Sequence, residues 1–273
     1  MGEWSLILFT ICMQAAIGAY LWVTIVKWKQ QDQDFSKLNI VIAALAALAM
    51  IVALLHLGTP TSAFRALSNI GSSWLSRENF FGGAFFGLAV VTLLLEMKNV
   101  NHSTTKVVRL LTGVVGILAV FSMSMLYMNS VMPAWNHYQT LIDFCATTVV
   151  LGGILTIVMA RKQVEEHVVK IAIAMALAVF IHAAVYVVFL AALGAGATAA
   201  QASIATLSGT FGIMLMIRWL LVLGGVGAVI FSQYAKAGHV AYMYAALAML
   251  VVGHLIGRYI FFAIAVAKGI GAT

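Results

Sequence analysis

The chain has 273 residues, of which 63% are hydrophobic and 8% are charged, and its mean hydropathy is +1.06. Soluble domains carry about 25% charged residues, so this composition excludes a water-soluble globular protein and indicates an integral membrane protein. The formal net charge of +7 would suit a nucleic-acid-binding protein, but the position of the basic residues along the chain, described below, argues against nucleic acid.

Eight long apolar stretches follow one another along the chain, with short polar segments between them. Both prolines, Pro60 and Pro133, fall in these polar segments, so the helices are expected to be unbroken, unlike those of many transporters. Residues 194–209 are small and uncharged and are expected to form a loop. The sequence predicts one all-α domain over residues 1–273, a bundle of eight transmembrane helices at roughly residues 5–26, 39–57, 79–97, 107–128, 141–160, 170–193, 210–234 and 240–267.

The basic residues of the loops predict how this bundle is oriented, because lysine and arginine are enriched on the cytoplasmic side of a membrane. Ten of them fall in or beside the loops on one side, namely Lys27, Lys29, Lys37, Lys98, Lys106, Arg109, Arg161, Lys162, Lys170 and Lys236. The other side has three, namely Arg65, Arg77 and Lys268. The side with ten is therefore expected to be cytoplasmic and both termini to face the outer, periplasmic side, and binding of nucleic acid is not expected.

Five ionisable residues on five different predicted helices lie in the outer half of the membrane, whereas the inner half is expected to have almost none. They are His56, Glu78, Asp143, Arg218 and Arg258. The two arginines lie about 12 and 13 Å from the outer ends of their helices at a rise of about 1.5 Å per residue. They could simply pair with the two carboxylates to hold the bundle together. Convergence of five helices on one depth instead favours a functional site, because ionisable groups inside a membrane are expensive.

The chemistry of these residues suits oxidation of a quinol. A neutral histidine beside a carboxylate, such as His56 and Glu78, can accept a proton and pass it on. Arginines can hydrogen-bond a quinone-type oxygen and stabilise developing negative charge. We expect Arg65 and Arg77, which lie between His56 and Glu78 in the sequence, to belong to the same site.

The electrons from a quinol would have to leave this chain, because its own residues provide no convincing redox centre. Cys12 and Cys145 both lie in apolar stretches, and an iron–sulfur cluster usually takes four cysteine ligands. No metal site is expected. The alternative is a haem b between His182 and His254, which lie near the middle of the membrane. A lone buried histidine is more often hydrogen-bonded to a neighbouring helix.

Several blocks of the sequence resemble the membrane anchor subunit of bacterial dimethyl sulfoxide reductases. They are Leu55-His56-Leu57-Gly58-Thr59-Pro60, Ala63-Phe64-Arg65, Leu67-Ser68-Asn69, Ser76-Arg77-Glu78 and, near the C-terminus, Leu255-Ile256-Gly257-Arg258. Chain length and eight spans agree with this family over the whole sequence. The first block is fairly specific, whereas Leu-Ile-Gly-Arg alone would be weak. The wider relatives are the polysulfide reductase-type (NrfD-like) membrane subunits.

This resemblance implies a respiratory complex in the bacterial inner membrane. A partner subunit would carry four [4Fe–4S] clusters, and a catalytic subunit would carry a molybdenum bis-pterin guanine dinucleotide cofactor. The anchor would take electrons from menaquinol in the membrane pool, and the residues matching His56 and Glu78 are associated with the quinol site. The anchors that it resembles tend to have a glutamate where this chain has His254, so either His254 takes over proton handling or the proton route differs.

A second class of function stays open, namely a transport or sensory membrane protein without a redox role. Unbroken helices count against transport. Polar groups on the outer side only would also count against it, because a transport pathway should have polar groups at both depths.

Overall fold

The computed structural model describes residues 2–56, 69–233 and 239–267. Within these ranges the regular structure is entirely helical. The helices are α1 (Gly2–Lys29), α2 (Ser36–His56), α4 (Trp74–Met97), α5 (His102–Met128), α6 (Gln139–Met159), the 3₁₀ helix η1 (Glu165–His167), α7 (Val168–Gly194), α8 (Thr198–Gly209), α9 (Gly212–Phe231) and α10 (His239–Ala263).

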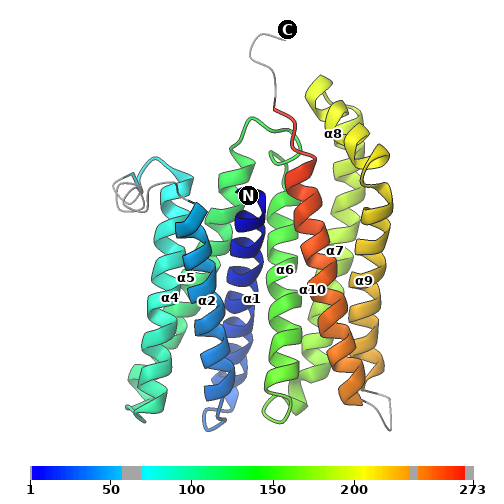
Figure 1. Cartoon of the computed structure of the whole chain (residues 1–273). Helices are drawn as coiled ribbons and strands as arrows, with labels where there is room; N and C mark the ends of the chain where they lie inside the picture. The colour runs from blue at the N-terminus through cyan, green and yellow to red at the C-terminus, as the bar shows by residue number, and fades with distance from the viewer. Residues whose placement is uncertain (1, 57–68, 234–238, 268–273) are drawn as a thin grey trace.

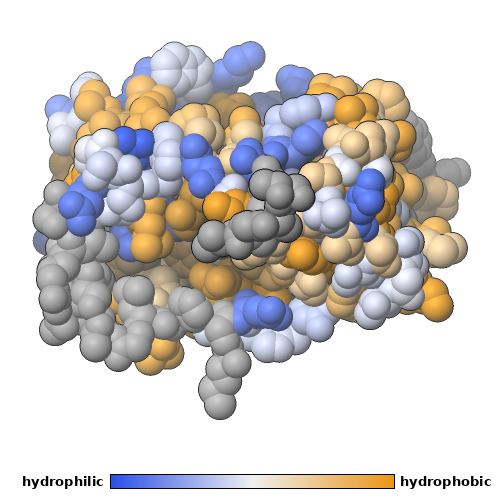
Figure 2. Space-filling view, turned by 90° about the horizontal axis from the view of Figure 1, so that it is seen from above, coloured by the Kyte–Doolittle hydropathy of each residue, from blue (hydrophilic) through white to orange (hydrophobic). Residues whose placement is uncertain are grey.

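Eight of these helices are long and apolar enough to cross a membrane, which confirms the eight predicted spans. They run up and down side by side, and α1 begins at the same end of the bundle at which α10 ends (Figure 1). We call this the terminal end and the other the opposite end. Figure 2 views the terminal end, where hydrophilic side chains are interspersed with hydrophobic ones. Which end faces the periplasm stays a prediction.

The prediction of a loop over residues 194–209 was wrong, because residues 198 to 209 form the helix α8 at the terminal end (Figure 1). Most of its residues are small and several are alanine, the residue with the highest helix propensity. It is far shorter than a membrane span, so a search for long apolar stretches could not find it.

The bundle is apolar on its outside as well as in its core, as expected for helices that face lipid. The side chains of Leu55, Ile213 and Phe180 are between 71% and 78% exposed although they are large and apolar. The most enclosed spans are α1 and α6, in which 72% and 67% of an 18-residue apolar stretch are buried.

The helices α1 and α6 approach each other at two glycines. A Cβ atom on Gly18 would collide with the backbone carbonyl oxygen of Thr148, and one on Gly152 would collide with the backbone of Gly18. Small residues of this kind let membrane helices pack backbone to backbone. This contact sets the distance between α1, which carries Gln14, and α6, which carries Asp143, and so positions the site described next.

Candidate functional site

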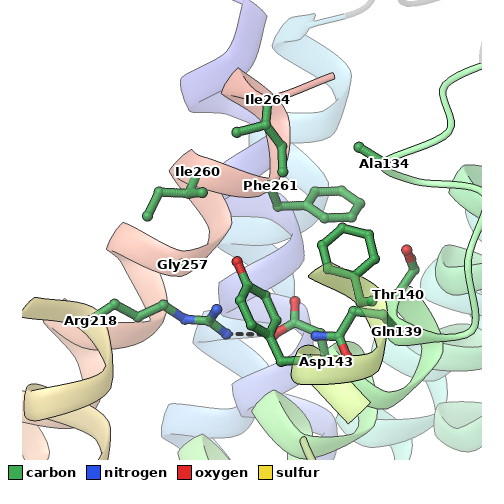
Figure 3. Close-up of a pocket in the computed structure, with 11 residues that line it drawn as sticks. Ala134, Gln139, Thr140, Asp143, Arg218, Gly257, Ile260, Phe261 and Ile264 are labelled. Carbon is green, nitrogen blue, oxygen red and sulfur yellow. Dashed lines mark hydrogen bonds and ion pairs between the residues drawn. The ribbon is translucent and has the colours of Figure 1, made fainter. Parts of the chain in front are cut away.

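Asp143 is the centre of a buried ion cluster near the terminal end, and Figure 3 shows its pairing with Arg218. It lies four residues into α6, or about 6 Å along the axis. Its Oδ1 accepts a hydrogen bond from Nη2 of Arg218 on α9 at 3.1 Å, and its Oδ2 lies 3.5 Å from Nη1 of Arg258 on α10. All three residues are at most 7% exposed. The predicted depths of Asp143, Arg218 and Arg258 in the membrane therefore identified three residues that are in contact in the structure.

Two further polar side chains complete this group, which we call the Asp143 cluster: Asp143, Arg218, Arg258, His182 and Gln14. His182 on α7 places its Nε2 3.3 Å from Asp143 Oδ1 and 3.3 Å from Arg218 Nη2. Arg258 Nη2 donates to Gln14 Oε1 on α1 at 3.0 Å. The cluster thus joins five helices, and His182 and Gln14 are members that the sequence analysis did not assign to the site.

Aromatic rings surround the two guanidinium groups. The Arg258 guanidinium carbon lies 3.8 Å from the centre of the Phe144 ring, and that of Arg218 lies 4.9 Å from the Trp219 ring. Cation–π contacts are strongest where the cation is desolvated, as here. These rings stabilise the two cations in a place that bulk water does not reach.

The Asp143 cluster has more positive than negative charge. Two arginines face one aspartate, which leaves a surplus of one positive charge when the histidine is neutral. Among the described residues, Nε of Arg218 and Oε1 of Gln139 are buried without a hydrogen-bond partner. Both residues line a pocket of about 20 Å³ beside Tyr186 and Gly257 (Figure 3). That space admits about one water molecule and is too small for a quinone ring.

Glu78 lies apart from this cluster. It is on α4, four residues from the start of the helix and only 3% exposed, and its Oε1 has no hydrogen-bond partner among the described residues. Within the described ranges no ion pair joins it to Arg218 or Arg258. The alternative in which the two arginines pair with both carboxylates therefore holds for Asp143 and fails for Glu78. A buried carboxyl group with an unused oxygen is a candidate for binding or proton transfer.

The remaining predicted site residues have different outcomes. Arg77 donates to the carbonyl oxygens of Ile70 and Gly71 and stacks on Trp74 at 4.2 Å, so it fixes the segment before α4. His56 is the last residue of α2, but its side chain lies outside the described residues, as does all of Arg65.

His254 and His182, the two candidate haem ligands, each have a hydrogen-bonded nitrogen. His254 is 4% exposed, and its Nδ1 lies 2.8 Å from the carbonyl oxygen of Leu250 on its own helix. Nε2 of His182 is engaged by the Asp143 cluster. These contacts favour the interpretation of both histidines as polar residues hydrogen-bonded within the bundle.

The expectation that the inner half has almost no ionisable groups was wrong. At the opposite end, Glu96 on α4 accepts hydrogen bonds from Lys27 Nζ at 2.9 Å and Arg109 Nη2 at 2.6 Å through Oε1, and from Asn39 Nδ2 at 2.8 Å through Oε2. We call these four residues the Glu96 cluster. Lys27 was assigned to the loop after the first span and Arg109 to the first turn of the fourth span. In the structure α1 extends past Lys27, α5 begins at His102, and both side chains are buried. Polar groups at both depths remove one argument against transport.

Gly257 determines where the Arg218 guanidinium can lie. A Cβ atom on Gly257 would lie 2.9 Å from Cζ of Arg218 and would collide with its Nε. We expect Gly257→Ala to push Arg218 away from Asp143 and to lower the free energy of unfolding by about 1–3 kcal/mol, as overpacking usually does. Thermal unfolding in detergent measures this. Gly227→Ala on α9, where nothing lies within 4 Å of the added atom, is the control, and equal stability of the two variants would contradict the expectation.

Comparison with known proteins agrees with the resemblance of the sequence blocks. The family model of the DMSO reductase anchor subunit (DmsC) matches residues 1–264. The C subunit of the anaerobic dimethyl sulfoxide reductase of Haemophilus influenzae is 35% identical over 157 residues, which cover 56% of this protein and 56% of that relative.

Two relatives from Escherichia coli match over nearly the full length. The anaerobic dimethyl sulfoxide reductase subunit YnfH is 26% identical over 98% of this protein and 96% of its own length. The C subunit of the anaerobic dimethyl sulfoxide reductase is 24% identical over 99% of this protein and 98% of its own length. With eight apolar helices and a family match that covers almost the entire sequence, this multi-pass membrane protein belongs to the DMSO reductase anchor subunit family.

Proposed function

We propose that this chain binds and oxidises menaquinol near the terminal end and passes the electrons to an iron–sulfur partner subunit in anaerobic respiration. The observation that carries the proposal is Glu78, a carboxyl group on α4 that is 3% exposed and has an oxygen without a partner among the described residues. Such an oxygen can accept a hydrogen bond from a quinol hydroxyl.

In this proposal the quinol ring lies between Glu78 and the C-terminal end of α2, whose last residue is His56. The pocket beside the Asp143 cluster is too small for the ring at about 20 Å³. Conversion of menaquinol to menaquinone releases two protons and two electrons. In this proposal Glu78 and His56 take the protons, and the two electrons leave for the partner subunit, so the balance is complete.

The Asp143 cluster has an electrostatic role in this proposal. Its surplus positive charge lies in the same outer layer as Glu78 and is poorly screened because the cluster is buried. A positive field of this kind lowers the energy of an oxygen that is losing its proton. Asp143 holds Arg218 and Arg258 in the positions from which their charge acts on the quinol oxygen. Arg77 orders the segment before α4 through its hydrogen bond to the Ile70 carbonyl oxygen.

The proposal also includes the location and the partners of the protein. The terminal end faces the periplasm of a bacterial inner membrane, consistent with the excess of basic residues at the opposite end. The partners are a subunit with four [4Fe–4S] clusters and a catalytic subunit with a molybdenum bis-pterin guanine dinucleotide cofactor.

The native complex should contain both molybdenum and iron after purification, and a preparation without either would favour the transport or sensory alternative.

Glu78→Gln is expected to leave the complex assembled and to lower quinol-driven reduction at least about 100-fold, the lower range for loss of an acid–base group. The glutamine keeps the shape of the side chain but cannot take a proton. The measurement is oxidation of a reduced menaquinol analogue by membranes that contain the complex. We expect His56→Ala to have a similar effect.

Arg77→Gln is the control for these variants, because Arg77 contacts backbone carbonyls of Ile70 and Gly71 and should keep most of the activity. Reduction driven by an artificial electron donor should be unchanged in all three variants, since it bypasses the quinol. Unchanged quinol oxidation in Glu78→Gln would remove Glu78 from the site.

A further inference from the structure

The opposite end of the bundle has a cavity of about 580 Å³ that the proposed quinol chemistry does not use. The ion-paired side chains of Lys27, Glu96 and Arg109 line it. Its other walls come from the segment between α1 and α2 and from the segment between α4 and α5. The cavity is therefore a polar pocket whose lining includes charged groups of the membrane-spanning helices.

These ion-paired groups have one more cation than anion. Glu96 is shared by Lys27 and Arg109, each of which is 7% exposed. Asn39 adds a hydrogen bond to Glu96 but no charge. Buried charges are stable only when they are paired and hydrogen-bonded. One positive charge of the Glu96 cluster has no counter-charge among these residues.

Arg109 gives an independent indication of a ligand. Its Nη2 is bound to Glu96, but its Nε is buried and has no hydrogen-bond partner among the described residues. The residue lines the cavity. Arginine presents several donors in one plane, which matches the oxygens of a phosphate group. A phosphate oxygen in the cavity would lie beside Arg109 and would compensate the surplus charge.

Two further carboxylates, those of Asp32 and Asp34, also line the cavity, and their negative charge opposes binding of an anion. Asp32 has a fully exposed side chain, and Asp34 is exposed and accepts hydrogen bonds from the backbone and hydroxyl of Ser36 at the start of α2. Exposed charges are screened by water and salt, and buried ones much less so. The buried charges of the lining, those of Lys27, Arg109 and Glu96, therefore sum to one positive charge, and the two carboxylates that offset it are exposed and screened.

We propose that this cavity binds a phosphate-type anion, supplied by the phosphodiester headgroup of an anionic phospholipid or by free phosphate. Two exposed apolar side chains that line the cavity, Met97 and Val100, suit the lipid form, because they can contact its glycerol backbone. Basic pockets between membrane helices on the cytoplasmic side are known as headgroup sites. This site does not depend on the quinol chemistry and shares with the proposed function only the orientation of the bundle.

The test uses the full-length protein in detergent and native mass spectrometry with phosphatidylglycerol, phosphatidylcholine or inorganic phosphate as the probe. Arg109→Gln removes the surplus charge but leaves the Lys27–Glu96 pair. We expect wild type to retain phosphatidylglycerol at least tenfold better than phosphatidylcholine and Arg109→Gln to lose this preference. If free phosphate is the source, inorganic phosphate and not phosphatidylglycerol should bind, with the same loss in the variant.

Lys106→Gln is the matched control, because it makes the same charge change on the same helix. Lys106 stacks on the exposed Trp28 ring at 4.5 Å and does not line the cavity, so its variant should bind like wild type. If Arg109→Gln does not fold, Lys27→Gln, which leaves the Arg109–Glu96 pair, makes the same test. Absence of any anion preference in wild type, or equal binding by wild type and the Gln variant, would overturn the proposal.

Discussion

Replacing Asp143 with alanine should lower the free energy of unfolding by about 3–5 kcal/mol, the usual cost of removing one partner of a buried ion pair. The carboxylate is shared by Arg218 and Arg258, and His182 also contacts it. Its loss leaves two buried guanidinium groups without a counter-charge and out of reach of bulk water. Thermal or denaturant unfolding of the purified protein in detergent measures the effect.

Two further variants show whether this effect comes from charge. Asp32→Ala removes an exposed carboxylate and should change stability by less than about 0.5 kcal/mol. The double variant Asp143→Ala with Arg218→Ala should be less unstable than the sum of the single variants, because the second change removes a cation that the first left unpaired. Simple additivity would show that the two side chains stabilise the bundle independently.

Gly18→Ala should lower the free energy of unfolding about as much as Asp143→Ala does. We expect a loss of about 3 kcal/mol or more, the upper part of the range for overpacking. The added Cβ would collide with the backbone carbonyl oxygen of Thr148. A backbone atom in a helix cannot rotate out of the way as a side chain can, so α1 and α6 would have to move apart. Gly18→Leu should leave no folded protein in a fluorescence-detected size-exclusion profile.

Gly87→Ala is the control for this prediction. Gly87 lies inside α4, as Gly18 lies inside α1, but nothing is within 4 Å of its added Cβ. Because alanine has the higher helix propensity by about 1 kcal/mol, Gly87→Ala should be neutral or slightly stabilising. If Gly18→Ala behaves like Gly87→Ala, the close contact of α1 and α6 is not what limits stability.

The long helices were predictable because a span is defined by its own residues. A stretch of about 20 apolar residues must cross the membrane wherever its neighbours lie, so hydropathy alone located all eight. It could not locate α8, which is shorter and lies at the terminal end. Hydropathy also placed Lys27 and Arg109 at helix edges, because a lysine or an arginine ends an apolar stretch in the sequence without ending the helix.

The contacts of the polar residues were predictable only in part. Depth along a helix follows from residue number, which is why Asp143, Arg218 and Arg258 could be assigned to one layer. Which residues in a layer meet depends on how each helix is rotated about its axis. That rotation is set by packing across the whole bundle, for example by the contact of Gly18 with Gly152. Glu78 therefore stays apart from the arginines, and His182 joins them.

The place of α1 has a consequence for how this protein is made. It leaves the ribosome before the other seven spans described above, yet Gln14 contacts Arg258, which follows 244 residues later, and Lys27 contacts Glu96, 69 residues later. At about 5–20 residues per second, synthesis of the longer interval takes roughly 12–50 s. During that time α1 lies in the membrane while Gln14, and at first also Lys27, lacks the partner that it has in the folded protein. Polypeptides truncated before α10 should therefore be preferred substrates for membrane quality control.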